Sequence, residues 1–149
     1  MTVIEFVDYQ CPFCARAVGE LKDLVYHHPG EVRLIVKQFP LSIHPHAERA
    51  ALAALAAGNA HQFWEMHDAL FAMQRDLSEE SIQQLTAATL GSANPAEADA
   101  LLRQKLHTDV REGIAAGVNA TPTLFVNGRL YSGAVDEHSL WEVIAPLAK

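Results

Sequence analysis

The spacing of apolar and polar positions predicts a strand, a helix and a second strand at the start of the chain. Val3 to Val7 is apolar at nearly every position, which is typical of a buried strand in a sheet covered on both faces. From Pro12 the period changes to that of a helix with one apolar face, which ends at the sequence His27-His28-Pro29-Gly30. Val32 to Val36 is again strand-like. We therefore expect a right-handed β-α-β unit.

The middle of the chain has the apolar period of helices. Ala47 to Ala57 is rich in alanine and leucine and is followed by Gly58-Asn59, a sequence that ends helices. Ser78, followed by two glutamates, predicts the N-cap of a helix that runs through Leu90. Between these two helices lies a further apolar face, made of Phe63, Met66, His67, Leu70 and Met73.

A fourth helix is expected to open at Asn94-Pro95-Ala96-Glu97, which resembles a capping box with proline at the first helical position. Gly117 is expected to end it. Its apolar face comprises Ala98, Leu101, Leu102, Leu106, Val110 and Ile114.

Strand-like sequence returns near the end of the chain. Thr123 to Val126 and Arg129 to Tyr131 flank Asn127-Gly128, which predicts a hairpin with a two-residue type I′ turn. A last helix is expected from about Asp136 to Leu147. The order is therefore β-α-β, then a block of helices, then β-β-α.

Composition narrows the class of protein. The 149 residues suit one domain, and the formal net charge of −7 argues against nucleic acid as a partner. No stretch is apolar for the ~20 residues that span a bilayer. Strand-like sequence follows Met1 at once, so we expect no signal peptide. This fits a cytoplasmic protein, and equally a mature domain from outside the cytoplasm that begins at an added methionine.

The only two cysteines lie in Cys11-Pro12-Phe13-Cys14, at the junction of the first strand and the first helix. Two thiols at this spacing suit reversible dithiol–disulfide chemistry. A purely structural disulfide is disfavoured, because so short a loop gains only about 2 kcal/mol from chain entropy. Unsatisfied N–H groups at the helix start favour the thiolate of Cys11, the expected nucleophile. Cys14, one turn inside the helix, is expected to be more buried and to act as the resolving thiol.

The sequence gives weaker support for a metal site or for another catalytic motif. Cys11 and Cys14 with His44 and His46 have the ligand count of a Cys₂His₂ zinc site, but their spacing is not that of a zinc finger. His67 is expected to be a core histidine, and the remaining histidines are expected at the surface: His27, His28, His61, His107 and His138. No phosphate-binding loop, dinucleotide fingerprint or nucleophile elbow is present.

The order of elements, with the cysteine motif at the first strand–helix junction and Thr121-Pro122 before the hairpin, resembles the thioredoxin superfamily. More narrowly, the chain resembles the DsbA-type thiol–disulfide oxidoreductases. The resemblance implies an α/β thioredoxin fold, with a mixed sheet formed by residues of about 1–42 and 118–149 and a helical insertion of about 43–117, in one domain of residues 1–149. The segments that carry it are Val3–Phe6, Cys11–Cys14, Phe39–Leu41, His44-Pro45, Phe63–His67, Gly117-Val118, Ala120–Thr123, Phe125–Gly128 and Gly133-Ala134.

Two features depart from the pattern of that family. DsbA-type proteins usually have a further strand before the one at Val3–Val7, so we expect the sheet to lack an edge strand. Phe13 replaces the histidine of the best-known oxidising motif. Phenylalanine cannot donate a hydrogen bond to the thiolate, so a milder oxidant is expected.

The resemblance implies roles for residues outside the cysteine motif. Glu5 holds the position of an acid that exchanges a proton with the resolving cysteine. Alternation along the strand places Glu5 in a row with Val3 and Val7, where burial should raise its pKa. An acid solvated at a frayed sheet edge is the alternative. Pro122 holds the position of the cis-proline that faces the cysteines, where Thr121 pairs with a substrate peptide.

The residues next to the cysteines carry a weaker functional signal. Phe13 and Pro12, with Tyr9, are expected to contact polypeptide substrates at an apolar rim, although ordinary packing is equally consistent with the aromatic residues. Asp8 is expected to be a solvated loop residue rather than a second group that exchanges protons.

The resulting hypothesis is a thiol–disulfide oxidoreductase that donates a disulfide to cysteine-containing polypeptides. It requires no cofactor other than the Cys11–Cys14 disulfide, and it requires a redox partner for recycling, with a membrane-bound protein as one candidate. A reductant, an isomerase and a non-enzymatic module of a larger protein remain alternatives. A disulfide donor implies a compartment outside the cytoplasm.

Overall fold

A computed structural model describes residues 1–91 and 100–148. The β-α-β unit is formed by β1 (Thr2–Val7), α1 (Pro12–His27) and β2 (Arg33–Gln38). The sequence prediction for β2 is therefore two residues short at its end. β1 and β2 are parallel, with Val3 opposite Leu34 and Val7 opposite Gln38.

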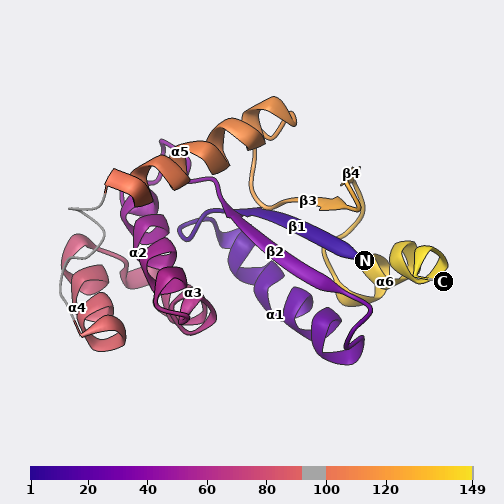
Figure 1. The fold of residues 1–149 in the computed structure, drawn as a ribbon, viewed down its shortest axis with the longest axis horizontal. Helices are drawn as coiled ribbons and strands as arrows, with labels where there is room; N and C mark the ends of the chain where they lie inside the picture. The colour runs from indigo at the N-terminus through magenta and orange to yellow at the C-terminus, as the bar shows by residue number, and fades with distance from the viewer. Residues whose placement is uncertain (92–99, 149) are drawn as a thin grey trace.

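The sheet has four strands in the order β2-β1-β3-β4 (Figure 1). β3 (Thr123–Val126) is antiparallel to β1, and β4 (Arg129–Tyr131) is antiparallel to β3. Asn127 and Gly128 both have positive φ, which confirms the type I′ turn between β3 and β4. The mixed sheet is thus the one expected from the sequence.

Helices cover both faces of this sheet. α1 and α6 (Glu137–Ile144) bury one face through a cluster that includes Val3, Leu21 and Leu140. The other face carries Phe6, whose ring packs edge-on against Phe39. Asp136 caps α6, but the final helix is interrupted at Ile144, and a separate 3₁₀ turn, η2 (Ala145–Leu147), follows with Pro146 near its start.

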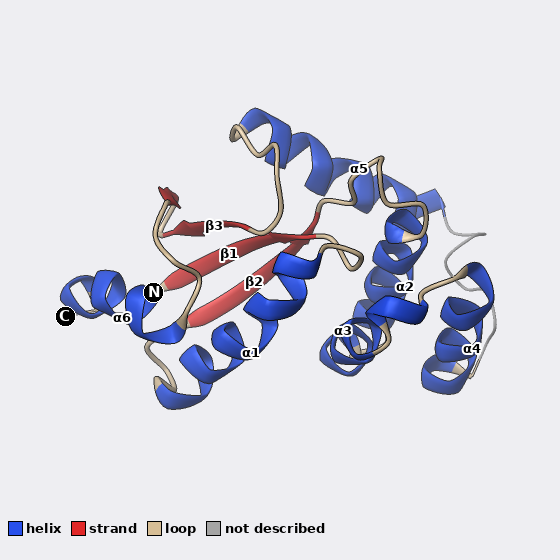
Figure 2. Ribbon diagram, turned by 180° about the vertical axis from the view of Figure 1, so that it is seen from behind, coloured by secondary structure: helices blue, strands red, loops and turns tan. Residues whose placement is uncertain are grey.

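The helical insertion consists of α2 (Ala47–Asn59), α3 (Phe63–Ala72), the 3₁₀ turn η1 (Gln74–Asp76), α4 (Glu79–Leu90) and α5 (Ala100–Ala115). Nine of the thirteen residues of α2 are buried, because the helix is packed on several sides. α3 and α4 contact one side of it, and α5 contacts another (Figure 2). Ser78 forms a capping box with Ser81 at the start of α4, as the sequence indicated for Ser78.

The prediction for the fourth helix is wrong at two positions. Leu101 and Ile114 are 73% and 63% exposed, because α5 buries only a narrow stripe that includes Leu102 and Leu106. The expected capping box at residues 94–97 and Ala98 lie outside the described residues.

β2 forms one edge of the sheet. The N–H of Arg33 donates to the carbonyl of Met1, so alternate residues point their backbone groups toward β1. Leu34, Val36 and Gln38 consequently point theirs outward. The N–H of Gln38 is bound by Asp109 of α5 at 2.9 Å, and no strand among the described residues pairs with the outward-facing backbone groups of Leu34 and Val36. β2 is therefore a free edge of the sheet in the described part of the chain.

Candidate active site

The two cysteines lie at the start of α1. Cys11 is the N-cap, Pro12 occupies the first helical position, and Cys14 lies in the first turn. Both are free thiols, with 4% of Cys11 and none of Cys14 exposed. The expected order of burial is confirmed. Cys11 is thus the more exposed of the two thiols.

Thr121 and Pro122 lie against this helix start. Their peptide bond is cis, as the resemblance implied. The Cys11 thiol donates to the Thr121 carbonyl with a separation of 3.2 Å between Sγ and the oxygen. The fold therefore brings together two segments that are separated by 110 positions in the sequence.

Glu5 is buried behind the thiols, in β1. Only 1% of it is exposed, because β1 lies between β2 and β3 and is not a sheet edge. The alternative of a solvated acid is therefore wrong. Burial raises the pKa of Glu5 to about 8, and its Oε1 accepts no hydrogen bond from the described residues. A carboxyl group with this pKa exchanges its proton near neutral pH.

The pKa of Cys14 is raised well above its ordinary value, mainly by burial. Negative charge on Cys11 or on Glu5 raises it further, whereas the Thr121 side chain opposes the rise. A thiolate on Cys14 is therefore unfavourable in this environment, and a proton donor beside it has a clear chemical use.

Asp8 is buried rather than solvated, which corrects the prediction from sequence. Its carboxylate accepts hydrogen bonds from the backbone N–H of Gln10 and of Leu41, both at 2.7 Å, and from Nδ1 of His44 at 2.8 Å. These bonds tie the turn before Cys11 to the loop between β2 and α2. A buried carboxylate is tolerated there because three donors surround it.

Gln74 holds the same turn from another direction. Its side-chain amide donates to the carbonyls of Tyr9 and Cys11, at 2.8 and 2.9 Å. Nothing in the sequence marked Gln74, because it lies in a 3₁₀ turn without a recognisable motif. The backbone N–H of His46 completes the attachment by donating to the side chain of Gln10 at 2.6 Å.

Tyr9 does not line the rim of the site, contrary to expectation. It is fully buried, and its hydroxyl lies 2.9 Å from Nδ1 of His67. Burial lowers the pKa of His67 to about 4, so its ring is neutral near pH 7 and shares a hydrogen bond with the tyrosine hydroxyl. His67 is thus the core histidine that the sequence predicted. His28 is half-buried rather than fully exposed, because its ring stacks on Trp141.

A groove of about 540 Å³ begins beside the thiols. α1 contributes Phe13, Arg16 and Ala17, and Phe13 is 62% exposed as expected of a residue that contacts substrate. The opposite wall is made of Ala120, Thr121, Pro122 and Val135. The groove therefore joins the residues between the cysteines to the cis-proline loop.

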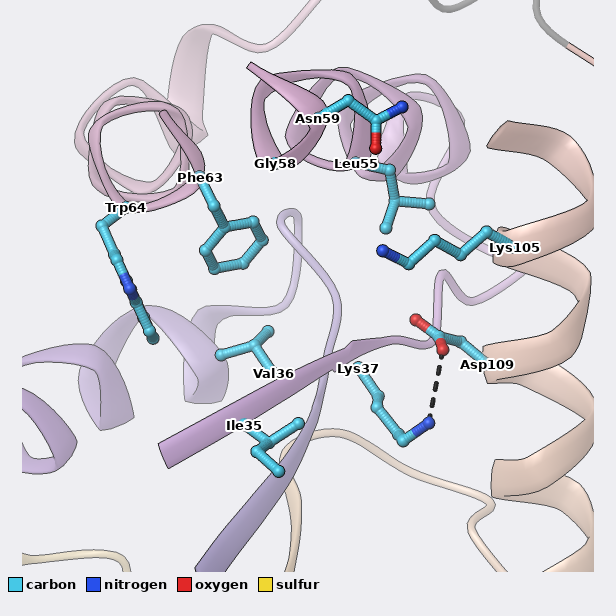
Figure 3. Close-up of a pocket in the computed structure, with 10 residues that line it drawn as sticks. All are labelled: Ile35, Val36, Lys37, Leu55, Gly58, Asn59, Phe63, Trp64, Lys105 and Asp109. Atoms are coloured by element: carbon cyan, nitrogen blue, oxygen red, sulfur yellow. Dashed lines mark hydrogen bonds and ion pairs between the residues drawn. The ribbon is translucent and has the colours of Figure 1, made fainter. Parts of the chain in front are cut away.

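A second hollow, of about 380 Å³, lies at the free edge of β2, away from the thiols. Figure 3 shows Phe63 and Trp64 of α3 on one side and Lys105 and Asp109 of α5 on the other. The outward-facing backbone of Val36 lies between them. The hollow contains neither cysteine and is separate from the candidate active site.

Metal-binding groups do not gather at the cysteines. Within residues 1–91 and 100–148, no three side chains of histidine, cysteine, aspartate or glutamate are arranged to hold a metal ion. His44, considered above as a zinc ligand, is instead bound to Asp8.

A paired thiol at a helix start, a facing cis-proline and a helical insertion define the class of thioredoxin-fold proteins that includes DsbA. The thioredoxin family model matches residues 1–145, and the chain belongs to that family. A thioredoxin-like oxidoreductase from Silicibacter pomeroyi is 27% identical, with a TM-score of 0.82 over 98% of this chain and 85% of that one. The thiol–disulfide exchange protein alpha-DsbA2 from Wolbachia pipientis shares the fold, with 23% identity and a TM-score of 0.84 over 98% and 81% of the two chains.

The similar curated proteins are much longer. A Na⁺/H⁺ antiporter NhaA from Herminiimonas arsenicoxydans is 34% identical over 148 residues, which are 97% of this chain and 23% of that protein. The chain thus spans about a quarter of the length of the curated relatives it matches. The helices in the described part of the chain are too short or too polar to cross a bilayer.

Proposed function

We propose that the protein is a thiol–disulfide oxidoreductase that donates its Cys11–Cys14 disulfide to cysteine-containing polypeptides. The general oxidoreductase role is supported by the family and by thioredoxin-like oxidoreductases of the same fold. The observation that carries the proposal is the 3.2 Å contact between Cys11 Sγ and the Thr121 carbonyl, at the end of an open groove.

The reaction begins with the disulfide form. A substrate thiolate attacks the sulfur of Cys11, a mixed disulfide forms, and Cys14 leaves with the electron pair of the broken bond. Glu5 gives its proton to Cys14, whose buried thiolate is unfavourable. A second substrate thiolate then displaces Cys11. The substrate is oxidised by two electrons, and the protein is left as the dithiol.

Thr121, Pro122, Phe13 and Pro12 position the substrate in this scheme. The backbone of Thr121 pairs with the extended peptide, and the exposed ring of Phe13 contacts its apolar side chains. A redox partner, with a membrane-bound protein as one candidate, accepts the two electrons and restores the disulfide. No cofactor beyond the two sulfurs is required.

The experiment is a trapping assay. A Cys14→Ala variant should accumulate mixed disulfides with an unfolded protein that contains disulfide bonds, because the Cys11 thiolate attacks such a bond and no Cys14 thiol is present to resolve the product. A Cys11→Ser variant should form none under the same conditions. Glu5→Gln should slow exchange at pH 7 by about tenfold or more, because it removes the proton donor. Full activity in the Cys11→Ser variant would refute the assignment.

The reduction potential decides the direction. A disulfide donor with Phe13 in its motif should lie between about −120 and −200 mV, whereas a value near −270 mV would indicate a reductant.

A second candidate is a redox module of a larger protein. It is favoured by the fact that the chain spans 23% of an antiporter to which it is 34% identical. Such a module would form the Cys11–Cys14 disulfide but would trap no polypeptide on the Cys14→Ala variant. The same trapping assay therefore separates the two functions.

A further inference from the structure

Arg16 is the charged side chain among the described residues that line the groove beside the thiols. The other lining residues are apolar apart from Thr121. The guanidinium lies over the ring of Phe13, 4.6 Å from its centroid, and is thereby held at the mouth of the groove. A cation in this position can attract or repel charged side chains of a peptide that binds in the groove.

Arg16 has no carboxylate within ion-pair distance in the described part of the chain. Glu20, one turn further along α1, instead accepts the backbone N–H of Glu137 at 2.9 Å. The net charge of −7 repels an acidic substrate at long range. At physiological ionic strength, however, charges more than about 8 Å apart are largely screened, so the nearby cation dominates.

The spacing between Cys11 and Arg16 along α1 indicates which residue of a bound peptide Arg16 can contact. Arg16 is five residues after Cys11, which corresponds to about 7.5 Å along a helix axis. An extended peptide advances about 3.3 Å per residue, so this distance spans about two residues of substrate. In an extended chain, residues two apart project from the same face. When the peptide runs along α1 through the groove that Arg16 lines, a side chain two positions from the reacting cysteine therefore lies level with Arg16.

From this geometry we infer that Arg16 is a specificity-determining residue, which selects substrates with an aspartate or glutamate two residues from the reacting cysteine. The inference rests on the proposed function, since it concerns polypeptides that exchange disulfides at Cys11. It names the substrate class of the groove as acidic, cysteine-containing segments rather than unfolded chains in general.

The test uses short reduced peptides with one cysteine and the disulfide form of the full chain. Three peptides carry aspartate, serine or lysine two residues before the cysteine, and three carry them two residues after it. On one side of the cysteine, the aspartate peptide should react with the disulfide form with a second-order rate constant about two- to fivefold above that of the serine peptide, as for an exposed ion pair. The lysine peptide should fall below the serine peptide.

Arg16→Glu should reverse this order, so that lysine is preferred to aspartate. Arg129→Glu is the matched control: it changes net charge equally, but Arg129 is exposed at the far end of the hairpin from Pro122. It should keep the aspartate preference. Raising the salt concentration should weaken the preference in the wild type, which a purely steric role of Arg16 would not cause.

The outcomes distinguish this inference from the proposed function. If the serine peptides react and the aspartate-to-serine ratio is the same in wild type and Arg16→Glu, the assignment of Arg16 is wrong while the exchange activity stands. If no aspartate peptide is preferred on either side of the cysteine, the inference also fails. If no peptide reacts at all, the proposed function itself fails.

Discussion

Replacing Glu5 by glutamine should change how stability depends on pH. The pKa of this carboxyl is about 8 in the folded protein and 4.5 when it is exposed in the unfolded chain. Between these values the unfolded chain has released the proton and the folded protein still holds it. Folding therefore becomes less favourable as the pH rises through this range.

The magnitude follows from the pKa difference. Each pKa unit corresponds to about 1.4 kcal/mol, so a rise of 3.5 units, from 4.5 to 8, amounts to about 5 kcal/mol. The free energy of unfolding of the wild type should therefore fall by this amount between pH 4.5 and pH 8. Above pH 8 it should change little. Glu5→Gln has no proton to release, so it should lack this loss and be the more stable protein at pH 8.5.

Urea unfolding at pH 4.5, 6.5 and 8.5 measures the effect. Both cysteines are replaced by alanine in every sample, so that thiol titration does not contribute. Glu65→Gln, a substitution of an exposed glutamate on α3, is the control and should follow the wild type closely. If the wild-type and Glu5→Gln free energies change in parallel over this pH range, the buried carboxyl is ionised in the folded protein and the reasoning is wrong.

Further substitutions test the surroundings of the site. Asp8→Asn removes the charge that three donors share, and should lower the free energy of unfolding by about 2–3 kcal/mol in urea; a change below about 0.5 kcal/mol would contradict its anchoring role. In α5, Gly113→Ala places a methyl group 2.7 Å from the ring of Phe39 and should cost about 1–3 kcal/mol, measured in the same way. Gly19→Ala, in α1, places a Cβ that meets no described atom within 4 Å apart from the neighbouring residues and the backbone of its own helix, and should instead stabilise by about 0.5–1 kcal/mol.

The fold was largely predictable because its signals are local. Periodicity gave the type of each predicted helix and strand, and Asn127-Gly128 gave the hairpin turn. The errors arise where tertiary contacts decide. Leu101 lies in an apolar pattern, yet α5 packs with a stripe too narrow to include it.

The centre of the candidate site was predictable for a different reason. Cys11, Cys14 and Glu5 lie in one strand–helix junction, and a family pattern linked them to Pro122. The contacts that hold these residues in place were not predictable. Asp8 is a polar residue before a turn, so the sequence predicts that it is solvated. Only the folded chain brings His44 to it. Tyr9 reads as an exposed aromatic residue until α3 covers it.

The attachment of the Asp8–Cys11 turn to the insertion limits how far the chemistry of this motif can be transplanted. Leu41, His44 and Gln74 all come from outside the β-α-β unit that carries the cysteines. Grafting Cys11–Cys14 into a minimal thioredoxin scaffold would transfer the two sulfurs without the hydrogen bonds that fix the turn leading to Cys11. Designers who borrow this site therefore need the insertion as well, and the two should be inherited together.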